Sequence, residues 1–187
     1  MADPAELTET ASGTDEVDPA LRRRSLLVLS LVAVSVVVVD VVTKTWIVNS
    51  VRLEGDISLL GGFLTITYTE NTGAAFSMGT GFTWVFTIIA VVVAIVILRS
   101  SRRLGSLLWA VGLGGLLGGL LGNLIDRLTR PPAFGADYLF GRGYVVDWIQ
   151  LPNFAVFNIA DSAIVCSAIL MVALSLFGVE FSGRPAR

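Results

Sequence analysis

Four long apolar runs constrain this chain more than any other feature of its sequence. They cover residues 26–46, 82–98, 104–125 and 157–177. An α-helix needs about 17–25 residues to cross a hydrocarbon core roughly 30 Å thick, and each run is of that length. Backbone polar groups inside lipid must be satisfied within the segment, so even the valine-rich first run is expected to be helical. The sequence therefore predicts four membrane helices in a single domain.

The segments outside these runs suggest a small sheet and two tails. Residues 57–60 and 63–69 are β-prone stretches separated by Gly61 and Gly62, and residues 145–155 can add a further strand. We expect this sheet to lie on the membrane surface. Residues 1–24 are mostly acidic and polar and are expected to form a disordered cytoplasmic tail. The membrane domain would then span residues 25–178, with a short cytoplasmic tail at 179–187.

The distribution of positive charge predicts the orientation. Arginines precede the first helix and occur in the connection between the second and third helices and in the C-terminal tail. The other two connections hold fewer positive charges near the helix ends. The positive-inside rule then places both termini in the cytoplasm. Trp46, Trp84 and Trp148 would lie at the outer boundary, where interfacial aromatic residues are common.

The residue types that are missing exclude several kinds of chemistry. The chain has no histidine and a single cysteine, Cys166. This excludes serine and cysteine catalysis with histidine, zinc sites of the HExxH type and an internal disulfide. The formal net charge of −2 gives no indication of nucleic-acid binding. Any chemistry must come from carboxylates, amides, hydroxyls, arginines or the one lysine.

Acidic residues gather at one end of the predicted helices. Asp147 lies in an outer connection, and Asp161 lies just inside the fourth run, with Asn158 one helical turn earlier. A carboxylate at such a depth is costly unless it is paired or solvated. We interpret Asp147 and Asp161 as the two acids of an aspartic protease, in which one carboxyl is ionised and the other protonated.

Two further groups of polar residues are predicted at the same end. Asp40 and Lys44 are spaced to form an ion pair on the first helix, as support for the site or as a purely structural pair. Asn123, Asp126 and Arg127 share one face of the third predicted helix. Asp126 and Arg127 are expected to pair with each other and to brace the connection that carries Asp147.

Two other functions remain open from the residues alone. A Ser-Lys protease would use Lys44 with Ser77 or Ser162, although Asp40 tends to keep the lysine charged and hence a poor base. A proton-coupled transporter would use the intramembrane acids as a relay, although transport favours acids that are deeper or on both faces.

The motifs, taken together and in order, resemble bacterial lipoprotein signal peptidase, also called signal peptidase II. The resemblance covers about residues 25–178. It rests on Asp40 and Lys44, residues 71–77 (NTGAAFS), 122–127 (GNLIDR), 145–147 (VVD) and 157–162 (FNIADS). It implies an all-α membrane protein with four transmembrane helices and a small extracytoplasmic β-cradle. The chain departs from the usual pattern in a long 128–144 connection and in its acidic N-terminal extension.

The resemblance also implies a function. Such an aspartic endopeptidase removes the signal peptide of a diacylglyceryl-modified prolipoprotein by cutting before the lipidated cysteine. It acts at the outer face of the cytoplasmic membrane as a monomer, in contact with membrane lipid, needs no metal or cofactor, and is inhibited by globomycin. Asp147 and Asp161 match the catalytic positions of the family. The matching supporting positions are Asp40, Lys44, Asn71, Gly73, Asn123, Asp126, Arg127, Asn158 and Ala160.

Overall fold

The computed structural model describes residues 17–73, 83–131 and 141–183. Within these ranges four helices are long and apolar enough to cross a membrane, which confirms the four predicted spans. They are α1 (Pro19–Asn49), α3 (Thr83–Ser100), α4 (Leu107–Thr129) and α5 (Ile159–Leu176). Three short helical segments accompany them: α2 (Val51–Glu54) after α1, η2 (Leu60–Gly62) in a hairpin turn, and η3 (Ser101–Arg103) after α3.

The first helix begins earlier than the apolar run indicated. Asp18 caps it by accepting a hydrogen bond from the amide of Ala20 at 2.8 Å, and Pro19 occupies the first helical position. Both are common helix-start signals. Residues 19–24 are therefore helical, and the prediction of a disordered tail is wrong for them. Residues 1–16 lie outside the described part of the chain.

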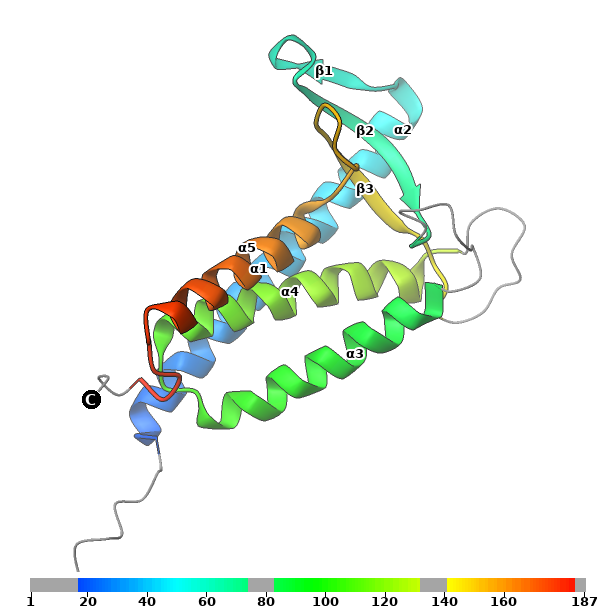
Figure 1. Ribbon diagram of the computed structural model, residues 1–187. Helices are drawn as coiled ribbons and strands as arrows, with labels where there is room; N and C mark the ends of the chain where they lie inside the picture. Colours follow the sequence, from blue (N-terminus) through cyan, green and yellow to red (C-terminus); the bar gives the residue numbers. More distant parts are fainter. Residues whose placement is uncertain (1–16, 74–82, 132–140, 184–187) are drawn as a thin grey trace, which may run out of the picture.

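Helix α4 is the centre of the bundle, with α1 and α5 packed along it (Figure 1). Glycines on α4 make this close approach possible. A Cβ on Gly118 would lie 2.7 Å from the backbone oxygen of Ala33 in α1, and a Cβ on Gly119 would meet the backbone of Ala160 in α5. The small-residue repeat seen in the sequence thus forms two helix interfaces, as its spacing predicts.

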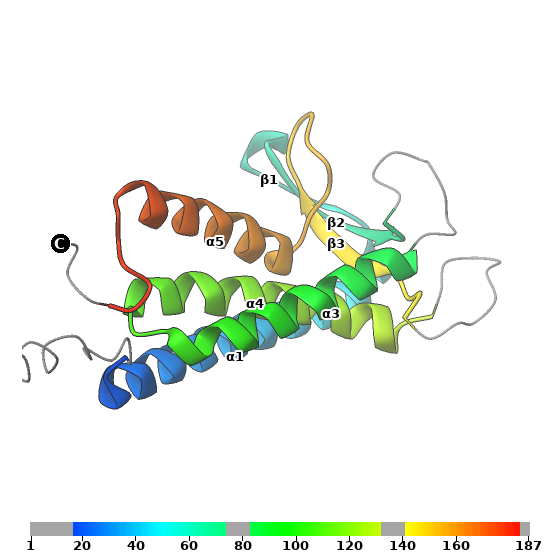
Figure 2. The same cartoon turned by 60° about the horizontal axis from the view of Figure 1, so that its bottom comes forward.

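A three-stranded antiparallel sheet lies at the end of the bundle where α4 ends and α5 begins (Figures 1 and 2). Its strands are β1 (Ile57–Leu59), β2 (Leu64–Asn71) and β3 (Val145–Gln150), in that order. The two predicted strand regions before α3 and the third after α4 are thereby confirmed. Buried apolar side chains join the sheet to the end of α1, namely Ile47, Val51, Ile66, Tyr144 and Val146. The sheet is therefore fixed directly over the helix ends that carry the acidic residues.

Candidate active site

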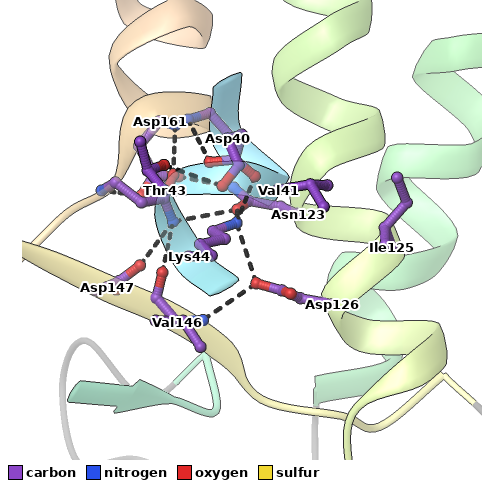
Figure 3. Close-up of polar contacts among 12 residues, drawn as sticks. Asp40, Val41, Thr43, Lys44, Asn123, Ile125, Asp126, Val146, Asp147 and Asp161 are labelled. Carbon is purple, nitrogen blue, oxygen red and sulfur yellow. Dashed lines mark hydrogen bonds and ion pairs between the residues drawn. The ribbon is translucent and has the colours of Figure 1, made fainter. Parts of the chain in front are cut away.

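Most of the predicted site residues converge where five elements meet, and Figure 3 shows the centre of this group. Helix α1 contributes Asp40 and Lys44, α4 contributes Asn123 and Asp126, β2 contributes Asn71, and β3 contributes Asp147. The start of α5 contributes Asn158, Ala160 and Asp161. Residues separated by as many as 120 positions are joined there by hydrogen bonds.

Asp161 is fixed by the way α5 begins. The side chain of Asn158 accepts a hydrogen bond from the Asp161 amide at 2.9 Å, and Asp161 Oδ2 accepts one from the Asn158 amide at 3.2 Å. This is a capping box, in which the first and fourth residues of a helix start satisfy each other's amides. The positive end of the helix dipole favours a negative carboxylate at this position.

Asp147 is held by two side-chain amides. Asn71 Nδ2 donates to its Oδ2 and Asn158 Nδ2 to its Oδ1, both at 2.7 Å. The Asn71 carbonyl in turn accepts a hydrogen bond from the amide of Gly73 at 2.7 Å. Gly73 has a φ of +87°, and a Cβ there would lie 2.7 Å from the ring of Phe86. The turn that orients Asn71 therefore requires glycine at this position.

The electrostatics of Asp147 differ from those of an ordinary surface aspartate. Its exposed fraction is only 2%. Burial, and then the negative charge of nearby Asp161, raise the pKa of Asp147 to about 7, while the hydrogen bonds from Asn71 and Asn158 oppose this rise. A carboxyl of this kind exchanges a proton near neutral pH, as a general acid or base must.

Two asparagines connect the carboxyl groups. Asn123 Nδ2 donates to Asp161 Oδ1 at 2.7 Å, and Asn158, which already contacts both acids, donates to Asn123 Oδ1 at 3.1 Å. Asp161 is half-buried, whereas Asp147 and Asn158 are buried. The arrangement thus holds two carboxyls in one hydrogen-bonded group.

A network of buried charges contacts this hydrogen-bonded group and the backbone beside it. Lys44 Nζ lies 2.7 Å from Asp40, 3.0 Å from Asp126 and 2.9 Å from the Asn123 carbonyl oxygen. Asp40 also accepts a hydrogen bond from the Ala160 amide at 2.9 Å, and Asp126 accepts one from the Val146 amide at 3.1 Å. The network therefore ties α1 and α4 to the residues beside Asp161 and Asp147.

The ion pair of Asp126 differs from the predicted one. Asp126 does brace the strand that bears Asp147, but its cationic partners are Lys44 and Arg130 rather than Arg127. Arg130 Nε lies 2.6 Å from Asp126 Oδ1. The predicted Asp126–Arg127 pair is therefore wrong, because adjacent residues on a helix point in different directions and Arg130 lies one turn further on. Arg130 could have been found from its i,i+4 spacing to Asp126.

Arg127 instead lies over the ring of Phe86, with 5.4 Å between its guanidinium carbon and the ring centroid. Its Nη1 atom is buried and has no hydrogen-bond partner among the described residues. Arg127 therefore packs on α3, while its positive charge is still close enough to interact with the charges of Asp147, Asp161 and Asp126.

The geometry also bears on the Ser-Lys alternative. The three polar contacts of Lys44 Nζ are to Asp40, Asp126 and Asn123, and Ser162 is not among them. The hydroxyl of Ser162 donates to the Asn158 carbonyl at 2.9 Å. Ser77 lies outside the described residues.

Across the described part of the chain, no group of three or more acidic, histidine or cysteine side chains is placed to hold a metal ion.

Comparison with known proteins identifies the family. A family model described as signal peptidase (SPase) II matches residues 32–177. The chain belongs to the signal peptidase II family. Proteins named lipoprotein signal peptidase from Mycobacterium tuberculosis H37Rv and Mycolicibacterium smegmatis are 44% and 46% identical over 180 and 178 residues. These alignments cover 96% and 95% of this chain, and 86% and 73% of the relatives.

Solved structures of bacterial membrane enzymes share the fold. One aligns with a TM-score of 0.66 at 33% identity and covers 78% of this chain and 90% of its own. A second gives a TM-score of 0.67 at 30% identity, covering 84% and 93%. The family, these neighbours and the four apolar helices make the chain a multi-pass membrane protein of the signal peptidase II family.

Proposed function

We propose that this protein is an aspartic endopeptidase that removes signal peptides from diacylglyceryl-modified prolipoproteins, cutting before the lipidated cysteine. The family and the names of its relatives support the reaction. One observation carries the assignment of the acids: Asp147 and Asp161 are hydrogen-bonded to the same asparagine, Asn158. In this proposal they are the two catalytic residues.

The mechanism uses one proton shared by the two carboxyls. Two acids close enough to interact titrate as a pair, and the first ionisation makes the second more difficult. Burial favours the neutral form of Asp147, so we assign the role of proton donor to Asp147 and the role of base to Asp161. Asp161 then takes a proton from water as the water oxygen attacks the scissile carbonyl carbon, while Asp147 donates its proton to the carbonyl oxygen. As the C–N bond breaks, the leaving nitrogen receives the proton taken by Asp161. Asp147 takes back a proton from one hydroxyl of the tetrahedral intermediate, which leaves a carboxylic acid and an amine and restores the pair.

The remaining site residues position this pair. Asn71 and Asn158 orient Asp147, with Gly73 fixing Asn71, and Asn123 orients Asp161. The buried carboxylates of Asp40 and Asp126 accept hydrogen bonds from the backbone amides of Ala160 and Val146. The supporting residues in this proposal are Asp40, Lys44, Asn71, Gly73, Asn123, Asp126, Arg127, Asn158 and Ala160.

We further propose that the site faces the outside of the cytoplasmic membrane and that both termini are cytoplasmic. The arginines in the first turns of α1 and those of η3 after α3 lie at the end of the bundle opposite the sheet, in agreement with the positive-inside rule. In this orientation the substrate's acyl chains remain in lipid while its peptide reaches the acids. We assign residues 25–178, extended to Pro19, to the peptidase unit, and we expect it to act as a monomer and to be inhibited by globomycin.

The test is cleavage of one lipid-modified prolipoprotein by purified protein. Asp147→Asn and Asp161→Asn should each reduce the rate on the order of 10²–10⁴-fold, because asparagine cannot exchange the proton. The double variant should be little slower than either single one, since groups that act as a unit are not additive. Asp56→Asn, an exposed acid between α2 and β1, is the matched control and should retain full activity.

The amount of folded protein is measured in the same membranes, so that lost activity is separated from lost enzyme. Substantial turnover by either active-site variant would contradict the aspartic mechanism. Proton flux in liposomes without cleavage would instead support the transporter hypothesis.

A further inference from the structure

A second site is suggested at the end of the bundle opposite the acids. A surface pocket of about 650 Å³ lies beside the turn between α3 and α4, lined by Val96, Arg99, Ser100, Arg102, Arg103 and Phe181. Figures 1 and 2 show that this turn, the start of α1 and the segment after α5 come together here. None of these residues contributes to the proposed peptidase site.

The pocket has a fixed wall, because the segment after α5 folds back onto the turn. The amides of Gly105 and Ser106 donate to the Phe181 carbonyl at 3.1 and 3.2 Å. The ring of Phe181 packs edge-on against Trp109, with 5.5 Å between centroids, and Trp109 Nε1 donates to the Val179 carbonyl at 2.8 Å. We expected residues 179–187 to form a tail, but residues 179–183 are thus part of a packed structure.

The charge of the pocket is not balanced. Arg99, Arg102 and Arg103 are all exposed, and no ion pair joins any of them to a carboxylate of the described residues. The C-terminal end of α3 favours positive charge only weakly. Three guanidinium groups around one pocket are suited to a phosphate group, whose oxygens accept paired N–H donors.

An apolar path leads from these arginines along the membrane-facing side of α3. Ile88, Val92, Val96 and Arg99 follow one another at helical spacings of four, four and three residues, so they share a face. The first three are 52%, 52% and 56% exposed. A ligand that fits both features has a phosphate at one end and a long hydrocarbon chain at the other.

We propose that this pocket binds an anionic phospholipid of the surrounding leaflet. Its headgroup phosphate contacts Arg99, Arg102 and Arg103 beside the Phe181 ring, and one acyl chain lies along Val96, Val92 and Ile88. Basic pockets at the ends of membrane helices recognise lipid headgroups in this way. The arginines at the start of α1 provide a contrast. Their smaller pocket, about 300 Å³, is formed by residues of α1 alone.

Native mass spectrometry of the purified full chain tests the proposal, with phosphatidylglycerol and phosphatidylcholine of identical acyl chains as probes. Phosphatidylglycerol should bind at one saturable site and phosphatidylcholine should not. The triple variant Arg99→Gln/Arg102→Gln/Arg103→Gln should weaken phosphatidylglycerol binding on the order of 100-fold. The matched triple variant Arg22→Gln/Arg23→Gln/Arg24→Gln loses the same charge and should bind almost as well as the unaltered protein. Equal losses in both would overturn the proposal in favour of diffuse attraction.

A second variant keeps the positive charge of the pocket but fills part of its apolar path. Val96→Trp fills the entrance to the apolar path and should reduce phosphatidylglycerol binding while leaving all arginines in place, so the result does not depend on whether the triple variant folds. Unchanged lipid binding by Val96→Trp would overturn the proposal. Excess inorganic phosphate should fail to displace the lipid. Full displacement would show a site for small anions rather than for a phospholipid.

Discussion

At the scale of single residues, Asn158 combines several roles in one side chain. Its side chain caps α5, donates to Asp147 and contacts Asn123. Serine at this position keeps the cap but is too short to reach Asp147. Asn158→Ser should therefore lose at least about 10-fold in kcat/KM, since charge-assisted hydrogen bonds contribute about 1.5–3 kcal/mol. Its melting temperature should fall less than that of Asn158→Ala, because the cap is kept.

Asn158→Ala is the companion variant, because it removes both the cap and the donor. It should lose activity and about 1 kcal/mol of stability as well. Activity and thermal unfolding are measured on the same preparations. Full activity in Asn158→Ser would show that the contact with Asp147 has no part in the reaction.

The raised pKa of Asp147 makes a prediction about pH. Below about pH 7 its carboxyl carries the proton that the proposed mechanism needs, and above this value the proton is lost. The rate, as kcat/KM, should therefore fall as pH rises through about 7. Asn71→Ala removes a donor that favours the ionised form, so the pKa of Asp147 should rise and the decline should move to higher pH. An unchanged profile would exclude Asp147 as the titrating acid.

The same pKa affects stability with a defined sign. The folded protein holds a proton on Asp147 at pH values where the unfolded chain, with an ordinary aspartate pKa of 3.8, has released it. This contribution to stability is fully present below pH 3.8 and is lost as pH rises through about 7.

At the scale of helices and strands, much was predictable because lipid imposes length and composition on a spanning helix. The four runs, the three strands and the Asp40–Lys44 pair all follow from spacing. Helix ends were less predictable. The third apolar run ends at residue 125, whereas α4 continues to Thr129 and so brings Arg130 onto the face of Asp126. Polar residues at a helix end do not reveal where the helix stops when their own ion pairs prolong it.

The ion-pair network makes a prediction about how the elements are held together. Lys44→Met would leave Asp40 and Asp126 buried without this shared cation, and removing one partner from a buried pair costs about 3–5 kcal/mol. The variant should melt at a lower temperature and accumulate poorly in membranes. Lys44→Met combined with Asp40→Asn should recover part of the stability, because one unpaired charge is then removed.

Arg52→Met is the control for this experiment, since Arg52 is an exposed cation of α2 that lies over the ring of Tyr68. It should change stability by less than about 1 kcal/mol. If Lys44→Met were as stable as this control, Lys44 would not be needed to balance the two buried carboxylates.

At the scale of the whole molecule, the chain has two chemically different ends. At one end lie the sheet, the carboxyl pair, the exposed Trp46 near the end of α1 and the exposed Trp84 near the start of α3. At the other are the arginines of α1 and η3 and the folded-back segment around Phe181. Such asymmetry favours a single orientation in the membrane, because positive charges are retained on the cytoplasmic side. In the orientation that we propose, the acids would meet a substrate from the opposite side.

Cysteine labelling measures this orientation directly. The background variant is Cys166→Ala, which is suitable because Cys166 is exposed on α5 and replacing it removes no buried contact. Single cysteines are placed at Gly61 in the hairpin turn, at Gly135 in the connection after α4, and at Arg102 in η3. A membrane-impermeant maleimide added to sealed right-side-out vesicles should modify positions 61 and 135 and spare position 102. Opening the vesicles should make 102 reactive, which shows that the residue is accessible. Labelling of 102 in sealed vesicles would reverse the orientation and place the carboxyl pair on the cytoplasmic side, where a secreted prolipoprotein could not reach it.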